Sequence, residues 1–148
     1  MDQEKDTLLV KTFPKFYADR FKSPQESCMS FGVDTGNGWF TIVWEMSEKL
    51  EKIINTIQIT CAFCTEEQAN CTCKEFEPYW PRAAQIKEKF GILRVYMTSQ
   101  TKEMDEIIAE AENKSSKTCE LCGDSGKRRG GGWVVTECDK CYNAKHQT

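Results

Sequence analysis

Histidine is almost absent from this chain. Its 148 residues include one histidine, His146. His-Asn-His nucleases and most zinc hydrolases need histidine as a ligand or as a base, so the composition argues against these enzyme classes. Chain ends are usually mobile, and we expect His146 to be a solvated residue of the tail.

Long apolar runs and basic leader sequences are also missing. No segment approaches the roughly 18 consecutive apolar residues of a membrane span. The first six residues, Met-Asp-Gln-Glu-Lys-Asp, are polar and acidic, unlike a secretory signal. Many cysteines without such a signal favour reduced thiols that bind metal, so we expect a cytoplasmic protein with no membrane partner. No phosphate-binding Walker loop or dinucleotide fingerprint occurs either.

Cysteine, in contrast, is abundant. Two C-x-x-C pairs near the C-terminal end are separated by fifteen residues: Cys119, Cys122, Cys138 and Cys141. This spacing is typical of a tetrahedral Cys₄ zinc site of the ribbon or finger type. Four thiolates leave no open position on the metal, which predicts a structural ion. Gly123 directly after Cys122 suits the tight backbone that such a turn needs.

A second cysteine cluster lies upstream, with the pattern C-x-x-C, six residues, C-x-C. It consists of Cys61, Cys64, Cys71 and Cys73. The intervening segment is polar and can close over a metal, so a second zinc site is possible. A disulfide pair and a redox-labile zinc centre are the alternatives. The ninth cysteine, Cys28, is expected to be a small buried hydrophobic residue.

The apolar pattern predicts an α+β fold. Steps of three and four residues from Trp39 to Ile57 predict a long core helix, and a similar pattern predicts a helix over 101–111 with Thr101 as its N-cap. Residues 82–90 are predicted to form a short helix that ends at Gly91, followed by a strand over 92–96. Short strands are expected over 27–34 and, as part of a hairpin, over 133–135.

Two units follow from this organisation. We expect residues 1–112 to form a body of helices packed on a small antiparallel sheet, with the cysteine cluster at 61–73 as an insertion. A polar linker over 113–117 would then lead into a zinc-ribbon-like module, and the whole unit would span 113–148. The module carries seven basic and four acidic residues, whereas the whole chain has a net charge of −3. The tail is therefore mildly basic on an acidic body.

Three stretches together resemble a known group. They are Gly38-Trp39, the string Gln85-Ile-Lys-Glu-Lys-Phe-Gly-Ile-Leu-Arg-Val-Tyr96, and the C-terminal module with its two cysteine pairs. Over about residues 36–141 the chain resembles a group of small, uncharacterised bacteriophage and prophage proteins with a Gly-Trp helix and a KEKFGxLRxY element. The resemblance implies a phage accessory protein in the cytoplasm of a bacterial host. It implies no particular chemistry.

A basic, glycine-rich loop between the C-terminal cysteine pairs is the best candidate contact surface. It contains Lys127, Arg128 and Arg129, then three glycines and Trp133. Adjacent cations on a flexible backbone can approach phosphates, and an indole can stack on a base. The alternative is a solvated hairpin tip whose tryptophan anchors the core.

These features favour a non-catalytic, zinc-binding accessory protein that engages a host macromolecule. Inhibition of a host defence system or redirection of a host enzyme would suit the phage resemblance. A host protein is favoured as partner, because a net charge of −3 weakens non-specific phosphate binding. A nucleic-acid-binding module that uses the basic loop is the first alternative. A carboxylate-metal nuclease, a redox switch at Cys61–Cys73 and a nucleotide-sequestering protein are further ones.

Overall fold

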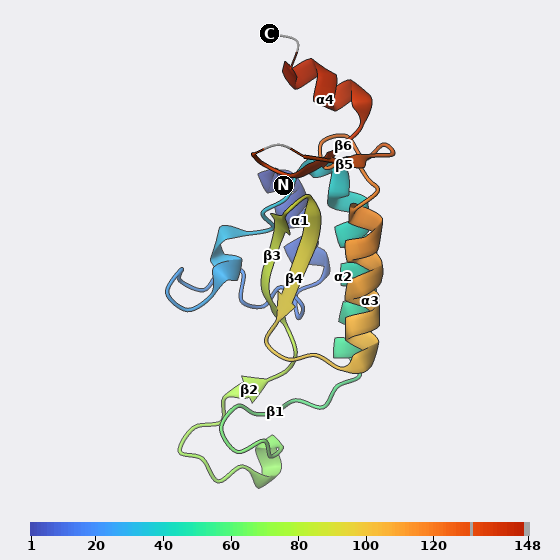
Figure 1. Cartoon of the computed structure of the whole chain (residues 1–148). Coiled ribbons are helices and arrows are strands. Elements are labelled where there is room, and N and C mark those ends of the chain that lie inside the picture. Colours follow the sequence, from blue (N-terminus) through green and yellow to red (C-terminus); the bar gives the residue numbers. More distant parts are fainter. Residues whose placement is uncertain (131, 147–148) are drawn as a thin grey trace.

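A computed structural model describes residues 1–130 and 132–146 and has α+β architecture (Figure 1). The helices are α1 (Gln3–Thr12), α2 (Phe40–Ile54), α3 (Lys102–Ser115) and α4 (Asp139–His146), with short 3₁₀ turns at Cys28–Phe31, Asn37–Trp39 and Gln68–Asn70. The strands are β1 (Thr60–Cys61), β2 (Pro78–Tyr79), β3 (Ala83–Lys89), β4 (Ile92–Met97), β5 (Lys127–Arg129) and β6 (Val135–Glu137). The described strands form three separate two-stranded antiparallel ladders, not the single sheet that we expected.

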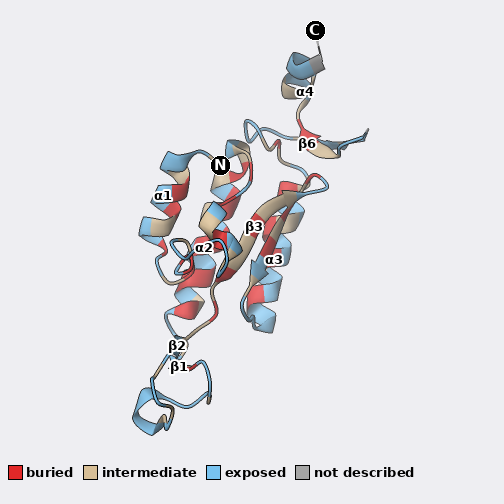
Figure 2. Cartoon of the chain, turned by 90° about the vertical axis from the view of Figure 1, so that its left-hand side faces the viewer, coloured by how far each residue is buried: buried red, intermediate tan, exposed pale blue. Residues whose placement is uncertain are grey.

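The core lies between α1, α2, α3 and the β3–β4 hairpin. Figure 2 shows the buried residues on the surfaces that these elements turn toward one another. The predicted core helix is confirmed as α2, which buries Val43, Met46, Leu50 and Ile54 along one face. Each such side chain contributes roughly 1.5–3 kcal/mol on full burial. This face of α2 is therefore a main source of the fold's stability.

The predicted helix over 82–90 is wrong, because these residues form strand β3. Lys89 pairs with Ile92 across a two-residue turn in which Phe90 and Gly91 have φ of 55° and 76°. Two successive positive φ values define the hairpin turn that matches the twist of antiparallel strands. Gly91 is thus a turn residue and not a helix cap. The segment has good helix formers, and its pairing with β4 overrides that preference.

The N-terminal region also differs from expectation. Residues 28–31 form a 3₁₀ turn instead of a strand, and of the predicted segment 27–34 only Asp34 makes a bridge, to Lys87 of β3. Cys28 is exposed in this turn, so its prediction as a buried hydrophobic residue is wrong. The core positions in this segment belong to Met29, which is fully buried, and to Val33.

A buried carboxylate ties α2 to the chain that follows α1. Glu51 is 8% exposed and accepts hydrogen bonds from the backbone N–H groups of Phe16 (2.7 Å) and Lys15 (3.2 Å). These donors lie just after α1, where the chain makes irregular turns. The carboxylate therefore satisfies polar backbone groups that the fold has buried.

We expect Glu51→Ala to lower the free energy of unfolding by about 2 kcal/mol, since it leaves two backbone donors without a partner. Glu48→Ala is the matched control. Glu48 lies on the same helix, pairs with Lys52, and is half exposed. Its loss should change stability by less than about 0.5 kcal/mol. Urea denaturation measures both variants, and equal effects would contradict the role given to Glu51.

Helix α3 begins as predicted and ends later. Thr101 is the N-cap and accepts from the Met104 N–H, which confirms its predicted role. The helix continues to Ser115, so the first residues of the expected linker are helical and the boundary placed at 112/113 falls inside α3. The Ser115 hydroxyl accepts the Leu93 N–H at 2.9 Å, which ties this last turn to β4. Body and C-terminal module are thus joined through a packed helix.

The C-terminal hairpin is present in a shifted position. Its second strand, β6, starts at Val135, so Trp133 lies in the loop before the strand and not within it. Helix α4 follows β6 and was not predicted. Gly131 and the side chain of His146 lie outside the described residues.

Candidate metal centres

The C-terminal cysteines converge on one point. The Sγ atoms of Cys119, Cys122, Cys138 and Cys141 all lie within 4.8 Å of one another. The Cys122 and Cys138 sulfurs are 3.7 Å apart. Four thiolates about 2.3 Å from one zinc ion would stand about 3.8 Å apart, whereas disulfide-bonded sulfurs are about 2.05 Å apart. The arrangement therefore suits a tetrahedral metal centre and not a disulfide.

Two kinds of local structure supply these ligands. Cys119 and Cys122 lie on a turn after α3, in which the Gly123 N–H donates to the Cys119 carbonyl (2.9 Å). Gly123 has φ of 83°, as its predicted role requires. Cys138 directly precedes α4 and accepts the Cys141 N–H at its Sγ (3.4 Å).

The upstream cluster has the same geometry. The sulfurs of Cys61, Cys64, Cys71 and Cys73 also lie within 4.8 Å of one another, and those of Cys64 and Cys71 are 3.7 Å apart. This cluster is closed by the short β1–β2 ladder. Four sulfurs at this spacing again suit one tetrahedral ion.

Both clusters begin with the same turn. In the upstream one, the Thr65 N–H donates to the Cys61 carbonyl (3.0 Å) and the Cys61 N–H donates to the Glu66 carbonyl (2.7 Å). In the C-terminal one, Gly123 and Asp124 occupy the positions of Thr65 and Glu66, with distances of 2.9 and 2.7 Å. The sequence shows no such repeat, because a threonine stands where the other turn has glycine. Thr65 has φ of 61°, which costs a β-branched residue roughly 1–2 kcal/mol.

Burial and hydrogen bonds give the thiols of each cluster different pKa values. The N–H groups of Phe63 and Cys64 lower the pKa of Cys61 to about 6, while its neighbour Cys64 raises that of Cys73 to about 12. Burial raises the pKa of Cys119, but the N–H groups of Cys138, Cys122 and Leu121 outweigh it and bring the value to about 7.

In the C-terminal cluster, the Asp124 N–H lowers the pKa of Cys122, but burial and the neighbouring Cys119 outweigh it and raise this pKa. Each cluster thus contains one thiol with a lowered pKa and one with a raised pKa. A divalent cation would favour the thiolate form of all four sulfurs.

The C-terminal centre is joined to the body through Glu120. The Glu120 carbonyl accepts the Gly38 N–H (2.7 Å), and its carboxylate accepts the Gly36 N–H (2.8 Å). Next to it, the buried Trp39 donates from Nε1 to the Thr118 carbonyl (2.7 Å). The start of α2 is therefore packed on the ligand turn itself.

The upstream centre lies at the opposite end of the molecule (Figure 1). The chain enters and leaves this centre through the two-residue strands β1 and β2, and the Ala62 N–H donates to the Glu77 carbonyl between these two arms (2.8 Å). Its loop is exposed, including Phe63 at 70%. Metal at this centre would order a local segment with little effect on the core.

Cys71→Ser tests this difference. We expect the variant to bind one metal ion per chain less than the wild type. Its melting temperature should fall by less than about 3 °C, because loosely attached segments open at little cost to the global fold. Native mass spectrometry and thermal denaturation give both values. A fall of about 10 °C or more would show that the upstream centre is part of the cooperative core.

The cations of the predicted basic loop bond to other parts of the chain. Lys127 and Arg129 both pair with Asp139 of α4, at 2.9 and 2.5 Å, and they lower its pKa to about 2. Arg129 also lies over the Tyr142 ring, 4.3 Å from its centre. Arg128 donates to the Phe90 carbonyl (3.0 Å). The three cations therefore connect β5 to α4 and to the β3–β4 turn.

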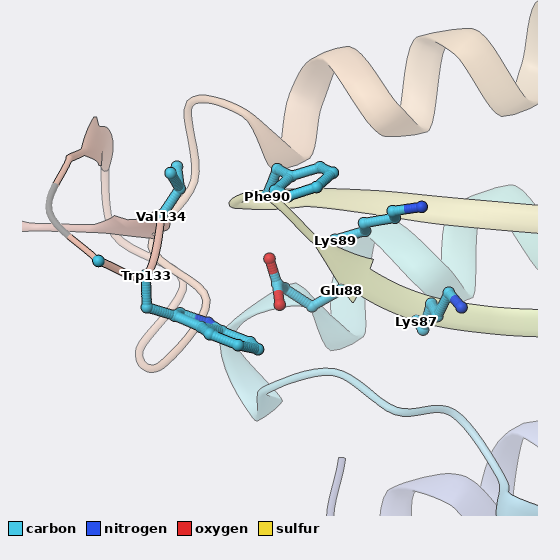
Figure 3. Close-up of a pocket in the computed structure, with 7 residues that line it drawn as sticks. Lys87, Glu88, Lys89, Phe90, Trp133 and Val134 are labelled. Carbon is cyan, nitrogen blue, oxygen red and sulfur yellow. The ribbon is translucent and has the colours of Figure 1, made fainter.

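Trp133 lies apart from these pairs, and a groove passes beside it (Figure 3). Trp133 is 76% exposed, so it does not anchor the core. The aromatic groove has a volume of about 460 Å³ and is lined by Lys87, Glu88, Lys89, Phe90, Gly132, Trp133 and Val134. Sequence reasoning missed it because a helix over 82–90 would not place Phe90 at a hairpin tip.

Carboxylates on α3 pair with lysines: Glu110 contacts Lys49 and Lys114. Within the described ranges, only the two cysteine sets bring three or more Cys, His, Asp or Glu ligand atoms together.

Comparisons with known proteins found no match: no family model, no curated protein and no solved structure matches the chain. Among the described residues, none of the helices has the length and apolar character needed to cross a membrane. The likeness to phage proteins thus remains a prediction from the sequence motifs.

Proposed function

We propose that this chain is a non-catalytic zinc-binding protein that engages another macromolecule. The observation that carries the proposal is the pair of closed four-sulfur clusters, because protein thiolates would fill every position of a tetrahedral ion. Zinc is the proposed ion, since it accepts such a soft, tetrahedral ligand set without redox chemistry. The ribbon-like character of residues 113–148 belongs to the same proposal. The metal would then brace surfaces and not activate a substrate.

The setting that we propose comes from the sequence resemblance. A phage-type accessory protein would work in the cytoplasm of a bacterial host, where reducing conditions keep metal-binding thiols available. Its role would be to inhibit a host defence system or to redirect a host enzyme. The Gly-Trp, KEKFGxLRxY and paired-cysteine motifs support this part of the proposal.

A host protein is the favoured partner. The net charge is −3, and two of the three cations of the basic loop are paired with Asp139. Both facts weaken a phosphate-binding surface. The exposed rings of Trp133 and Phe90 suit a protein interface, where aromatic residues carry much of the binding energy.

Affinity capture from a bacterial host tests the proposal. The tagged protein, purified under reducing conditions, is incubated in parallel with nuclease-treated and untreated lysate. Bound proteins are identified from both samples, and bound nucleic acids from the untreated one. We expect one host protein, or a few, captured in stoichiometric amounts. The complex should survive at about 0.3 M salt, where attraction between exposed charges is strongly screened. Metal-dependent turnover of nucleic acids or nucleotides, or capture of nucleic acid alone from untreated lysate, would contradict it.

A further inference from the structure

The aromatic groove brings together two exposed rings from distant parts of the chain. Phe90 at the β3–β4 turn is 63% exposed, and Trp133 in the loop before β6 is 76% exposed. Large aromatic side chains clustered at a surface mark interaction sites more often than chance. The groove volume of about 460 Å³ falls within the range of about 300–1,000 Å³ typical of ligand pockets.

The two walls of this groove are bonded to each other. The Thr136 hydroxyl of β6 donates to the Gly91 carbonyl (2.5 Å), and the Arg128 guanidinium of β5 donates to the Phe90 carbonyl (3.0 Å). Thr136 is fully buried, so the first of these bonds is shielded from water. Strands β5 and β6, which flank the Trp133 loop, are therefore held against the turn that carries Phe90, and a partner would not have to bring these elements together.

The charges at the groove are mostly positive. Lys87 and Lys89 extend from β3 on the side away from Trp133 (Figure 3). Arg128 donates to the Phe90 carbonyl at the turn. Lys89 lies over the Phe90 ring, with its Nζ 5.5 Å from the ring centre. The one carboxylate, Glu88, accepts the Gly91 N–H at 2.5 Å and is held by the turn. The groove thus presents apolar rings beside cations.

We propose that the aromatic groove binds an acidic segment of a protein partner, with one large apolar side chain between Trp133 and Phe90 and carboxylates on Lys87 and Lys89. This inference rests on the proposed function and assigns its binding surface. Charge complementarity selects the acidic residues, and desolvation of the rings supplies the affinity.

A single-stranded nucleic acid is the less suitable occupant. Its bases could stack on the rings, but stacking of this kind needs a row of cations that follow the backbone. Here Lys127 and Arg129 are paired with Asp139, which leaves Lys87 and Lys89 as the cations of the described groove lining. Two lysines can pair with the carboxylates of a short acidic segment, whereas a nucleic-acid backbone needs a longer row of cations.

Fluorescein-labelled peptides of twelve residues test the inference by anisotropy. Each carries one central Leu, Phe, Trp or Ser, flanked by zero, two or four glutamates. We expect binding to need an apolar centre and to strengthen with each pair of glutamates. Trp133→Ala should weaken it about tenfold or more, as for an interface hot spot. Lys89→Glu should remove the preference for glutamates.

Phe63→Ala is the matched control, because Phe63 is a similarly exposed ring (70%) at the far end of the molecule. It should leave peptide binding unchanged. Trp133→Ala should keep both metal ions and its melting temperature within about 2 °C, since the side chain is mostly solvated. Three results would overturn the inference: equal peptide binding by Trp133→Ala, tighter Trp133-dependent binding of a dT₁₂ oligonucleotide, or self-association that depends on Trp133.

The capture experiment separates this inference from the proposed function. If Trp133→Ala captures the same host protein as the wild type, the groove is not the interface and the inference fails, while the proposed function stands. If the wild-type protein captures no host protein, the proposed function itself fails.

Discussion

Cys122→Ser is expected to cost one metal ion per chain and to lower the free energy of unfolding by about 4 kcal/mol or more. Structural zinc contributes apparent binding free energies of about 10–16 kcal/mol in zinc-finger peptides. Losing only part of that binding energy can therefore lower the free energy of unfolding by more than about 4 kcal/mol. Cys122 is exposed, and its side chain does not contribute to the apolar core. The effect would therefore report on the metal and not on side-chain packing.

Thermal denaturation with metal analysis measures this effect. For a chain of this length, we expect the melting temperature to fall by roughly 10 °C or more. Cys28→Ser is the matched control, since Cys28 is also exposed and belongs to neither cluster. It should keep two metal ions and the wild-type melting temperature. If Cys122→Ser behaves like Cys28→Ser, the C-terminal cysteines do not form a structural centre.

Gly38→Ala is expected to produce the second large effect, a loss of about 3 kcal/mol or more. A Cβ atom on Gly38 would lie 2.2 Å from the Cys119 carbonyl oxygen and 2.5 Å from the Gly123 nitrogen. Both are backbone atoms of the ligand turn, so no flexible side chain can move aside. The methyl group would push the C-terminal centre away from the start of α2.

Gly130→Ala is the control for this substitution, because a Cβ atom there would meet nothing within 4 Å. Its effect should stay within about 0.5 kcal/mol. A chelator-competition assay gives a second readout, in which Gly38→Ala should release one of the two metal ions faster than the wild type. Equal stability and equal release for both alanine variants would show that the ligand turn does not pack on Gly38.

The sequence was most informative where the determinants are local. Cysteine spacing defined both ligand sets, because a C-x-x-C turn directs two sulfurs to one point whatever surrounds it. The three- and four-residue periodicity defined α2, and the cap at Thr101 defined the start of α3. Each of these signals lies within a few residues of the element that it predicts.

The sequence was least informative where contacts are distant. Residues 82–90 have good helix formers, and only the pairing of Ile86 with Val95 and its neighbours makes them a strand. The hydrogen bond from the Gly36 N–H to the Glu120 carboxylate joins residues 84 positions apart. No local sequence pattern predicts this contact, so the pattern divides the chain into a body and a separate C-terminal module. The loop cations are predicted as a contact surface because Asp139, the partner of Lys127 and Arg129, lies on a helix that the sequence pattern does not predict.

The metal content of the folded protein tests the central claim most directly. Protein purified under reducing conditions without chelator is analysed for zinc by elemental analysis, and its unfolding is followed in the same sample. We predict two zinc ions per chain and a cooperative transition whose midpoint strong chelators lower by roughly 10 °C or more. A sample without bound metal that still unfolds in one sharp transition at the same temperature would contradict the account.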